Sequence, residues 1–374
     1  MSEVPEHNAE LDEETKKRIK SVGGELDDEN RSASFLQIDQ DVTRSSSRFE
    51  NVEVMGIKQA MKKYDWVKDY MWKAIDREKD EYTKAVDTED VNGYFIRSMP
   101  NAKVDFPVEA CLYLKKAGGT QKVHNVIIAE EGSELNIISG CTSHPGVASG
   151  LHLGVSEFYV KKNAKLTFTM IHSWESGIEV RPRSASIVEE DGVFISNYIL
   201  MNPVKIVQMY PVAYLEGDRS TAIFSSVIVG LEGTHIDSGS KAVLRGEKSG
   251  ADIISRTISR GGTIIARGDI VGDSHDARGH LECRGLMLSE KGMIHAIPEL
   301  EGRFPDLDLS HEAAIGKIAE EEIFYLMSRG LSRDESTTAI IRGFMDIEIK
   351  GLPDFLKKEI DKAVSMVEEE IAPD

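Results

Sequence analysis

The sequence predicts a mainly β fold, built as a solenoid of stacked coils with α-helical segments at both ends. Between about residues 104 and 300, short runs rich in β-branched and aromatic residues follow one another without a helical period. Similar joints separate them, with charged residues before a glycine or asparagine that accepts the positive φ of a tight turn. The glycine or asparagine positions of these joints are 132, 163, 192, 217, 250 and 292, at intervals of about 25 to 40 residues. Such a period indicates the coils of a solenoid, which stack their apolar faces on one another.

A sandwich of antiparallel hairpins is the alternative for the same stretch. Two-residue hairpin turns favour Asn-Gly or Asp-Gly, and between residues 104 and 300 the sequence offers one such pair, Asp191 and Gly192. This scarcity favours the solenoid, which we assign to residues 101–304 as a β-helix core.

Residues 1–100 are expected to form an N-terminal helical segment with a flexible connector. The stretch from Thr43 to Arg48 is rich in serine, which is typical of a connector. Between Met55 and Val86, apolar residues recur at spacings of three and four, namely Trp66, Val67, Tyr70, Met71, Ala74 and Ile75. This spacing predicts an amphipathic helix that packs against another element.

Residues 305–374 are expected to form a C-terminal helical domain of three short helices. Serines suited to N-capping, a glycine suited to a C-terminal turn and a first-turn proline set their limits. These limits are Ser310 to Gly330, Ser332 to Gly343 and Pro353 to about Glu370.

The same region holds more apolar residues than a small bundle easily hides. They are Phe324, Leu331, Ile340, Ile341, Phe344, Leu352 and Phe355. Two interpretations stand at this stage, an internal core or a docking surface for a partner protein.

Composition excludes several classes of protein. The formal net charge is -19, which disfavours DNA or RNA as the main partner because phosphate binding needs clustered basic residues. The polar N-terminus lacks the apolar core of a secretory signal, and no apolar run is long enough for a membrane span. Three cysteines, without a CxxC pair, favour free thiols in a reducing compartment. We expect a soluble, cytoplasmic protein with no membrane insertion.

Motifs of self-sufficient enzymes are missing from the sequence. GxxxxGK[ST] has no match, so we do not expect this chain to hydrolyse ATP by itself. HEAAI begins like a zincin helix, but Ile315 holds the place of its second histidine. GxSxG, the nucleophile turn of many hydrolases, is also absent.

The three cysteines differ in their surroundings. Strand alternation places Cys283 on the same face as Leu281 and opposite Glu282, and an inward cysteine is commonly a small core residue. Cys141 lies in the polar, glycine-containing stretch SGCTSHPG, where function and packing are equally plausible. Cys111 is flanked by apolar alternation and is interpreted as core.

His311 and Glu312 are expected at a helix start. The positive end of the helix dipole favours a carboxylate there, so Glu312 needs no functional role to explain its position. His172 and Trp174, in MIHSWES, and His152, in GLHLG, are individually more typical of structure than of function. Thiolate, imidazole and carboxylate together nevertheless form a ligand set that Fe(II) accepts.

Several stretches together resemble the SufB/SufD family of iron-sulfur cluster assembly scaffolds. They include GCTSHPG, GLHLGVSEFYVKKNAKLTFTMIHSW, ISRGGTIIARG, HLECRGLML, LSHEAAIGKI and EEEIFYLMSRGLS, and the likeness covers about residues 100–350. The resemblance implies a right-handed parallel β-helix flanked by helices, with C-terminal helices that dock a SufC-type ABC ATPase.

Within that family the chain looks like SufB. The resemblance implies a nascent cluster held by Cys283, His311 and Glu312, with Glu282 assisting. It also implies sulfur acceptance and transfer at Cys141, His172 and Trp174, although many SufB proteins have glutamine at the position of His172. Arg181 or Arg183 falls where a basic residue of the internal sulfur path is expected.

The resemblance therefore implies a scaffold without enzymatic activity of its own. The chain lacks the N-terminal CxxCxxxC motif of many SufB proteins and is similar to compact archaeal and anaerobe forms, for which we expect a homodimer formed through the β-helix. The resemblance also implies a transient iron-sulfur cluster as cofactor, with none necessarily bound on purification, and apo iron-sulfur proteins as recipients. Two alternatives stay open: a β-helix enzyme with Glu282 and Glu299 as acid and base, and a metal-free adaptor for the ATPase.

Overall fold

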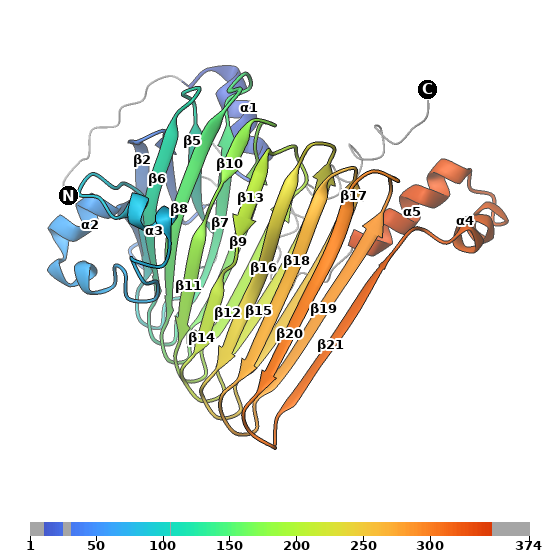
Figure 1. Cartoon of the computed structure of the whole chain (residues 1–374). Helices are drawn as coiled ribbons and strands as arrows, with labels where there is room; N and C mark the ends of the chain where they lie inside the picture. Colours follow the sequence, from blue (N-terminus) through green and yellow to red (C-terminus); the bar gives the residue numbers. More distant parts are fainter. Residues whose placement is uncertain (1–10, 25–30, 105, 346–374) are drawn as a thin grey trace.

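The computed structural model describes residues 11–24, 31–104 and 106–345 and shows a β-solenoid of about eight turns. Each turn of the core gives one strand, or two short strands, to each of two facing sheets (Figure 1). Neighbouring turns pair in parallel in both sheets. This pairing confirms the predicted solenoid and rules out a sandwich of antiparallel hairpins, because hairpins would give antiparallel neighbours.

Sheet A is the ten-stranded sheet of the described chain. Its spatial order is β2 (Asp41–Ser47), β1 (Ala33–Ile38), β5 (Val108–Leu114), β7 (Glu134–Ser143), β9 (Lys165–Ser173), β12 (Val193–Leu200), β15 (Thr221–Leu231), β17 (Gly250–Arg260), β19 (Arg278–Met287) and β21 (Asp308–Gly316).

Sheet B faces it with eleven strands among the described residues. In chain order they are β3 (Val52–Gly56), β4 (Tyr94–Ser98), β6 (Thr120–Ala129), β8 (Gly150–Val160), β10 (Ile178–Val180), β11 (Arg183–Val188), β13 (Ile206–Met209), β14 (Val212–Leu215), β16 (His235–Leu244), β18 (Thr263–Gly272) and β20 (Met293–Gly302).

The main hydrophobic core fills the space between the two sheets. Every second side chain of a strand points inward, and parallel register stacks equivalent positions from turn to turn. One such row in sheet A contains Ile137, Phe168, Phe224, Ile253 and Leu281, all of them buried. Burial of these rows is the main favourable contribution to folding of a solenoid, because each turn contacts only its neighbours.

The turns that lead from sheet B to sheet A share one left-handed backbone residue. These residues are Asn101, Gly132, Asn163, Asp191, Arg219, Lys248 and Asp276, spaced 28 to 31 residues apart. Each of the first six donates its backbone N–H to a carbonyl in the turn of the next coil, such as Arg219 to Glu247 at 2.8 Å. The real period is therefore tighter than the predicted one, because charged residues as well as glycine occupy this position.

Three of the predicted joint positions were misplaced. At 192, 217 and 250 the neighbouring Asp191, Arg219 and Lys248 adopt the positive φ instead. Gly217 is required for a different reason: a Cβ there would lie 1.9 Å from the backbone nitrogen of Glu190 in the preceding coil. Gly292, with φ of 95°, lies in a turn that leads from sheet A to sheet B.

The prediction of one amphipathic helix from Met55 to Val86 is wrong. This stretch holds the end of β3 and three short helices, α2 (Ile57–Lys63), η2 (Asp65–Asp69) and α3 (Glu81–Val86). The serine-rich stretch predicted as a connector forms most of β2 instead, antiparallel to β1. Helix α1 (Glu13–Ser21) packs Ile19 and Val22 against the outer face of sheet A, where it covers Cys111.

The buried carboxylate of Glu157 explains why the long helix is interrupted. Glu157 lies on the outer face of sheet B and accepts backbone N–H groups from Trp72 and Ala74 at 2.6 Å and from Ile75 at 3.3 Å. His124 Nε2 lies 2.7 Å from the same carboxylate, and both side chains are fully buried. Trp72 takes φ of 61°, a conformation that no helix interior permits.

The C-terminal region departs from prediction at its start. The expected helix beginning at Ser310 is the strand β21, parallel to β19, because pairing extends sheet A by one more turn. Helix α4 (Glu320–Met327) follows, and Gly330 has φ of 100° three residues after it. Helix α5 (Arg333–Met345) has the predicted capping box, in which Ser332 Oγ accepts from Glu335 N and Glu335 accepts from Ser332 N. The third predicted helix lies outside the described residues.

The apolar residues of the C-terminal region divide into two groups. Ile341 and Met345 of α5 are buried against Val229, Ile258 and Leu286 on the outer face of sheet A. The exposed group consists of Phe324, Tyr325, Met327 and Leu331. Leu352 and Phe355 lie beyond the described part of the chain. Helix α5 is thus attached to the solenoid, and α4 lies beside it at the C-terminal end of the described chain (Figure 1). Helix α4 presents apolar side chains to solvent.

Replacing Glu157 with alanine should lower the free energy of unfolding by about 3 to 5 kcal/mol, because buried N–H groups and His124 lose their acceptor. Urea denaturation measures the loss. Glu134→Ala is the control: Glu134 is 43% exposed and pairs with Lys165, so we expect a change below about 1 kcal/mol. Equal losses in the two variants would show that Glu157 does not anchor the N-terminal helices.

Candidate functional site

Cys283 lies on the inner face of sheet A, in the second-last strand of that sheet. It is 2% exposed and belongs to the main core with Leu281, as strand alternation predicts. Burial, with a smaller contribution from the charge of Glu282, raises the pKa of the thiol to about 11. In this state Cys283 is a protonated, inert thiol.

The strand register separates the four predicted cluster residues into two pairs. His311 of β21 is opposite Leu281 of β19, and Glu312 is opposite Glu282. Because paired residues of parallel strands point to the same side, His311 shares the inner face with Cys283, and Glu312 shares the outer face with Glu282. The sequence placed His311 and Glu312 at a helix start; they lie on an exposed edge strand instead.

Glu282 is held on the outer face by two arginines. Its Oε1 lies 2.9 Å from Arg256 and 2.5 Å from Arg284, and the Glu282 side chain is 13% exposed. Arg284 also approaches Glu312 at 3.9 Å. The expectation that Glu282 points away from Cys283 is confirmed.

A second polar group lies inside the solenoid near its N-terminal end. Cys141 is buried on β7 and is paired in register with His172 of β9. His172 Nδ1 lies 3.1 Å from the hydroxyl of Tyr198, and the rings of His172 and His152 contact Trp174. The structure therefore brings Cys141, His172 and Trp174 together, with His152, which the sequence assigned to structure, as a further member.

Burial controls the protonation of this group. It raises the pKa of Cys141 to about 12 and lowers the pKa of His152 to about 4. It also holds the pKa of His172 well below its ordinary value, to which nearby His152 adds. At neutral pH the thiol is protonated and both imidazoles are neutral, so the site carries no net charge in its resting state.

A row of hydroxyl groups runs along the inner face of sheet A toward Cys283. Tyr198, Ser226, Ser255 and Cys283 occupy paired positions in β12, β15, β17 and β19. Ser226 Oγ donates to Ser255 Oγ at 3.1 Å. Two adjoining internal cavities border this row, both lined by Tyr198 and one also by Ser226 and Ser255. We call Tyr198, Ser226 and Ser255, which lead to Cys283, the hydroxyl row.

Cys141 and Cys283 are far apart in space. Their strands, β7 and β19, are five steps apart in sheet A. At about 4.8 Å for each step, the two thiols are separated by roughly 24 Å. Direct transfer between them is excluded by this distance.

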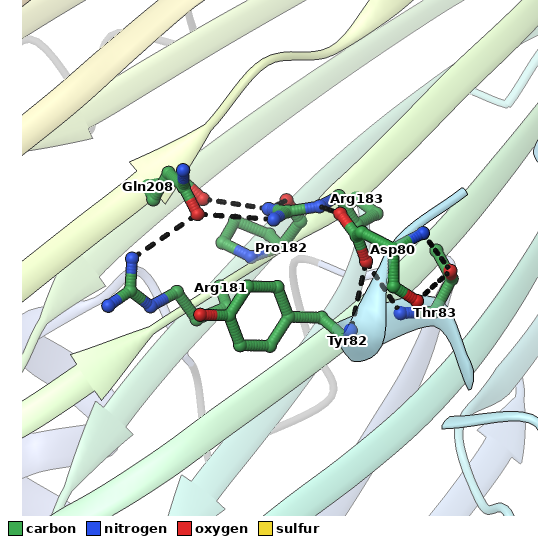
Figure 2. Close-up of polar contacts among 7 residues, drawn as sticks. All are labelled: Asp80, Tyr82, Thr83, Arg181, Pro182, Arg183 and Gln208. Carbon is green, nitrogen blue, oxygen red and sulfur yellow. Dashed lines mark hydrogen bonds and ion pairs between the residues drawn. The ribbon is translucent and has the colours of Figure 1, made fainter. Parts of the chain in front are cut away.

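Arg181 and Arg183 do not line the interior, contrary to expectation. They lie on the outer face of sheet B, where both guanidinium groups contact the ring of Tyr82 and Gln208 accepts from both (Figure 2). Arg183 Nε also lies 2.5 Å from Asp80, the N-cap residue of α3. These arginines attach the N-terminal helices to the solenoid, because α3 packs on this face.

The described residues contain no group of three or more His, Cys, Asp or Glu side chains arranged to hold a metal ion. Cys283 and His311 supply at most two ligands from the inner face. Any metal bound at this edge would take its remaining ligands from rearranged groups or from another molecule. In the same described segments, no helix is long and apolar enough to cross a membrane.

Comparison with known proteins agrees with this architecture. Residues 112–344 match the family model described as SUF system FeS cluster assembly, SufBD core domain. A protein of Archaeoglobus fulgidus described as an iron-sulfur cluster assembly SufBD family protein is 69% identical over 356 residues, which cover 95% of this chain and 96% of the relative. A relative in Methanothermobacter thermautotrophicus is 44% identical over 97% of this chain and 90% of its own length.

The solenoid and these matches define a protein of iron-sulfur cluster assembly. The chain belongs to the SufBD family. The resemblance found in the sequence is thereby confirmed at the level of the family.

Sequence reasoning missed Ser226, Ser255 and Arg256, and it assigned His152 to structure. A signal was available for the serines, because Ser226, Ser255 and Cys283 are separated by 29 and 28 residues, the length of a coil. Once a solenoid period is known, residues one period apart are neighbours. The contact of His152 with Trp174 has no such signal, because His152 lies on β8 of sheet B and Trp174 follows the end of β9 of sheet A, less than one coil later in the chain.

Acidification should destabilise the protein between pH 6.5 and about 4. The pKa of His152 is about 4 in the folded state and ordinary when unfolded, so the unfolded chain binds the extra proton. Stability contributed by neutral His152 is complete above pH 6.5 and falls by up to about 1.4 kcal/mol per pH unit below it.

Urea denaturation at several pH values measures this slope. His172 adds a contribution of the same sign. His152→Gln should therefore reduce the slope without abolishing it, and His235→Gln, which changes an exposed ring, should leave it as in the wild type. An unchanged slope in His152→Gln would contradict the assignment of a neutral, buried His152.

Proposed function

We propose that this chain is a SufB-type scaffold on which a nascent iron-sulfur cluster, the cargo of the protein, is built at the last turn of the solenoid. The observation that carries the proposal is the position of Cys283 and His311 on one inner face at the open edge of sheet A. His311 ends a row whose preceding members on β15, β17 and β19 are the apolar residues Phe224, Ile253 and Leu281. An imidazole in that place has no packing role, because its side chain is exposed.

A second copy of the chain completes the site in this proposal. β20 pairs only with β18 and β21 only with β19, so both strands present unpaired backbone groups at the end of the described solenoid. Met293 and Ile315 on these strands are 46% and 45% exposed. Pairing with another copy would cover the edge and these apolar side chains, and would bring two Cys283 and His311 pairs together.

Sulfur enters at Cys141 and travels inside the solenoid in this proposal. His172 and Trp174 surround the entry thiol, and the hydroxyl row leads from Tyr198 to Cys283. Hydroxyl groups stabilise a polar sulfur species by hydrogen bonding without reacting with it. The row therefore supports transport over the last three of the five strand steps between the two cysteines, about 14 Å.

The C-terminal helices dock a SufC-type ABC ATPase in this proposal. Helix α4 exposes Phe324 and Tyr325 by 58% and 59%. Helix α5 contacts the outer face of β15, β17 and β19, the strands that carry the last part of the hydroxyl row and Cys283. Movement of the ATPase would therefore reach the cluster site through packed side chains. Recipients of the finished cluster are apo iron-sulfur proteins.

The geometry disfavours the alternative of a carboxylate acid and base enzyme. Glu282 lies on the outer face of sheet A, and alternation in β20 places Glu299 on the outer face of sheet B. The two side chains point away from each other across the solenoid, so they cannot flank one scissile bond. A metal-free adaptor for the ATPase is the other alternative, and the next experiment addresses it.

Cys283→Ser should lose the visible absorption of a cluster that is reconstituted anaerobically with ferrous iron, sulfide, the ATPase and ATP. The loss follows because a serine hydroxyl is a poor ligand for iron in a cluster. Cys111→Ser is the matched control, since Cys111 is equally buried but faces α1 outside the solenoid. The cluster absorption of the Cys111→Ser variant should stay near that of the wild type. Full absorption in Cys283→Ser would favour the adaptor.

Phe324→Asp should reduce co-purification of the ATPase at least tenfold, on the order expected when a central apolar anchor of an interface is lost. Phe49→Asp is the control, because Phe49 is 42% exposed and lies between β2 and β3, far along the chain from α4. Quantitative blotting of the ATPase against the scaffold gives the ratio. Equal recovery with both variants would place the ATPase elsewhere.

A further inference from the structure

Charged residues on the outer face of sheet A form a compact network directly behind Cys283. Glu282 is in register with Glu312 on β21, and Arg284 is in register with Arg256 on β17. Arg256 and Glu282 are largely buried, with 12% and 13% of their side chains exposed. Arg284 is half-exposed and reaches the Glu282 carboxylate at 2.5 Å.

Arg284 lies between the carboxylates of Glu282 and Glu312, which differ in how firmly they are held. It contacts Glu282, which Arg256 also holds, and it approaches Glu312 at 3.9 Å. Glu312 is 66% exposed and lies on an edge strand that pairs on one side only, with β19. Of the two carboxylates, Glu312 is therefore the one free to leave Arg284.

We propose that Glu282, Arg256 and Arg284 form a latch that holds Glu312 on the outer face of sheet A until a cluster is assembled. In the latch Glu282 shares Arg284 with Glu312, which keeps the contact of Arg284 with Glu312 weak enough to open, and Glu282 is not an iron ligand. Release of Glu312 from Arg284 leaves its exposed side chain free to bend around the open edge of β21 toward Cys283, while His311 keeps its place on the inner face. This inference rests on the proposed function, because it names the control of the same site.

The chain connection indicates what opens the latch. Helix α4 starts at Glu320, four residues after β21 ends at Gly316. A force applied to α4 by a docked partner would act first on β21, since its outer edge has no strand to hold it. The ion pair of Arg284 with Glu312 is the contact that such a movement breaks first, because it is the longest and most exposed in the network.

Arg284→Ala should increase the affinity for ferrous iron about two- to fivefold, the range expected for loss of one exposed ion pair that competes with binding. Titration of anaerobic protein against a chromogenic chelator measures this affinity. Arg284→Lys, which keeps a positive charge, should bind iron close to the wild-type level. Hydrogen exchange of the β21 amides, residues 308–316, should be faster in Arg284→Ala.

Glu282→Gln gives an effect of the opposite sign. Without the Glu282 charge, Arg284 pairs with Glu312 alone, so the latch tightens and iron affinity should fall by a similar factor. Arg303→Ala is the matched control: Arg303 is also 50% exposed and pairs with Asp273 and Glu301, but it lies outside this network. Its affinity and β21 exchange should equal those of the wild type.

The latch is overturned if Arg284→Ala behaves like Arg303→Ala in both measurements, or if Arg284→Ala and Glu282→Gln shift iron affinity in the same direction. The double variant Arg284→Ala with Cys283→Ser separates this inference from the proposed function. If the double variant retains the full gain in iron affinity, the iron is not bound at Cys283 and the proposed site fails. Faster β21 exchange in Arg284→Ala would then still support the latch, and unchanged exchange would refute it.

Discussion

The parallel register between successive coils is the constraint on which the rest of the structure depends. Each coil takes 28 to 31 residues between equivalent corner positions, so a side chain meets the equivalent side chain of the next coil. Apolar rows then form one continuous core, and polar rows form continuous lanes. A shift of one residue would move every side chain of a strand to the opposite face, and the buried rows oppose such a shift.

This register explains how β19 can carry a buried thiol on one face and an ion-pair network on the other. Cys283 faces the interior, where burial keeps its thiol protonated, while Glu282 and Arg284 face outward in an ion-pair network. A thiol with a pKa of about 11 does not bind iron readily, since the thiolate is the ligand. Exposure of the last turn, by a partner or by movement of β21, would reduce the burial that keeps the thiol protonated. The resting structure therefore protects the thiol that the proposed function uses.

The attached helices add control without entering the core. The short helices between β3 and β4, α2, η2 and α3, are held on sheet B by the carboxylate of Glu157 and by Arg183 with Asp80. Helix α5 is held on sheet A by Ile341 and Met345. These helices and α5 therefore sit on opposite sheets, while α1 shares sheet A with α5. Helix α5 lies behind the strands that carry Ser226, Ser255 and Cys283. The path of packed side chains from a docked partner to the cluster site is therefore short.

The sequence by itself determined the fold class, the family and the inward direction of Cys283, because strand period, turn residues and local motifs are all encoded over short distances. It misjudged His311 and Glu312, since Ser310 resembles a helix cap and local capping preference cannot anticipate pairing with β19, thirty residues earlier. Tertiary structure alone decided that Arg181 and Arg183 lie outside the solenoid and that Cys283 and His311 share one face while Glu282 and Glu312 share the other. The physical reason is that face and neighbour in a solenoid are set by register between coils, which depends on the exact length of every turn.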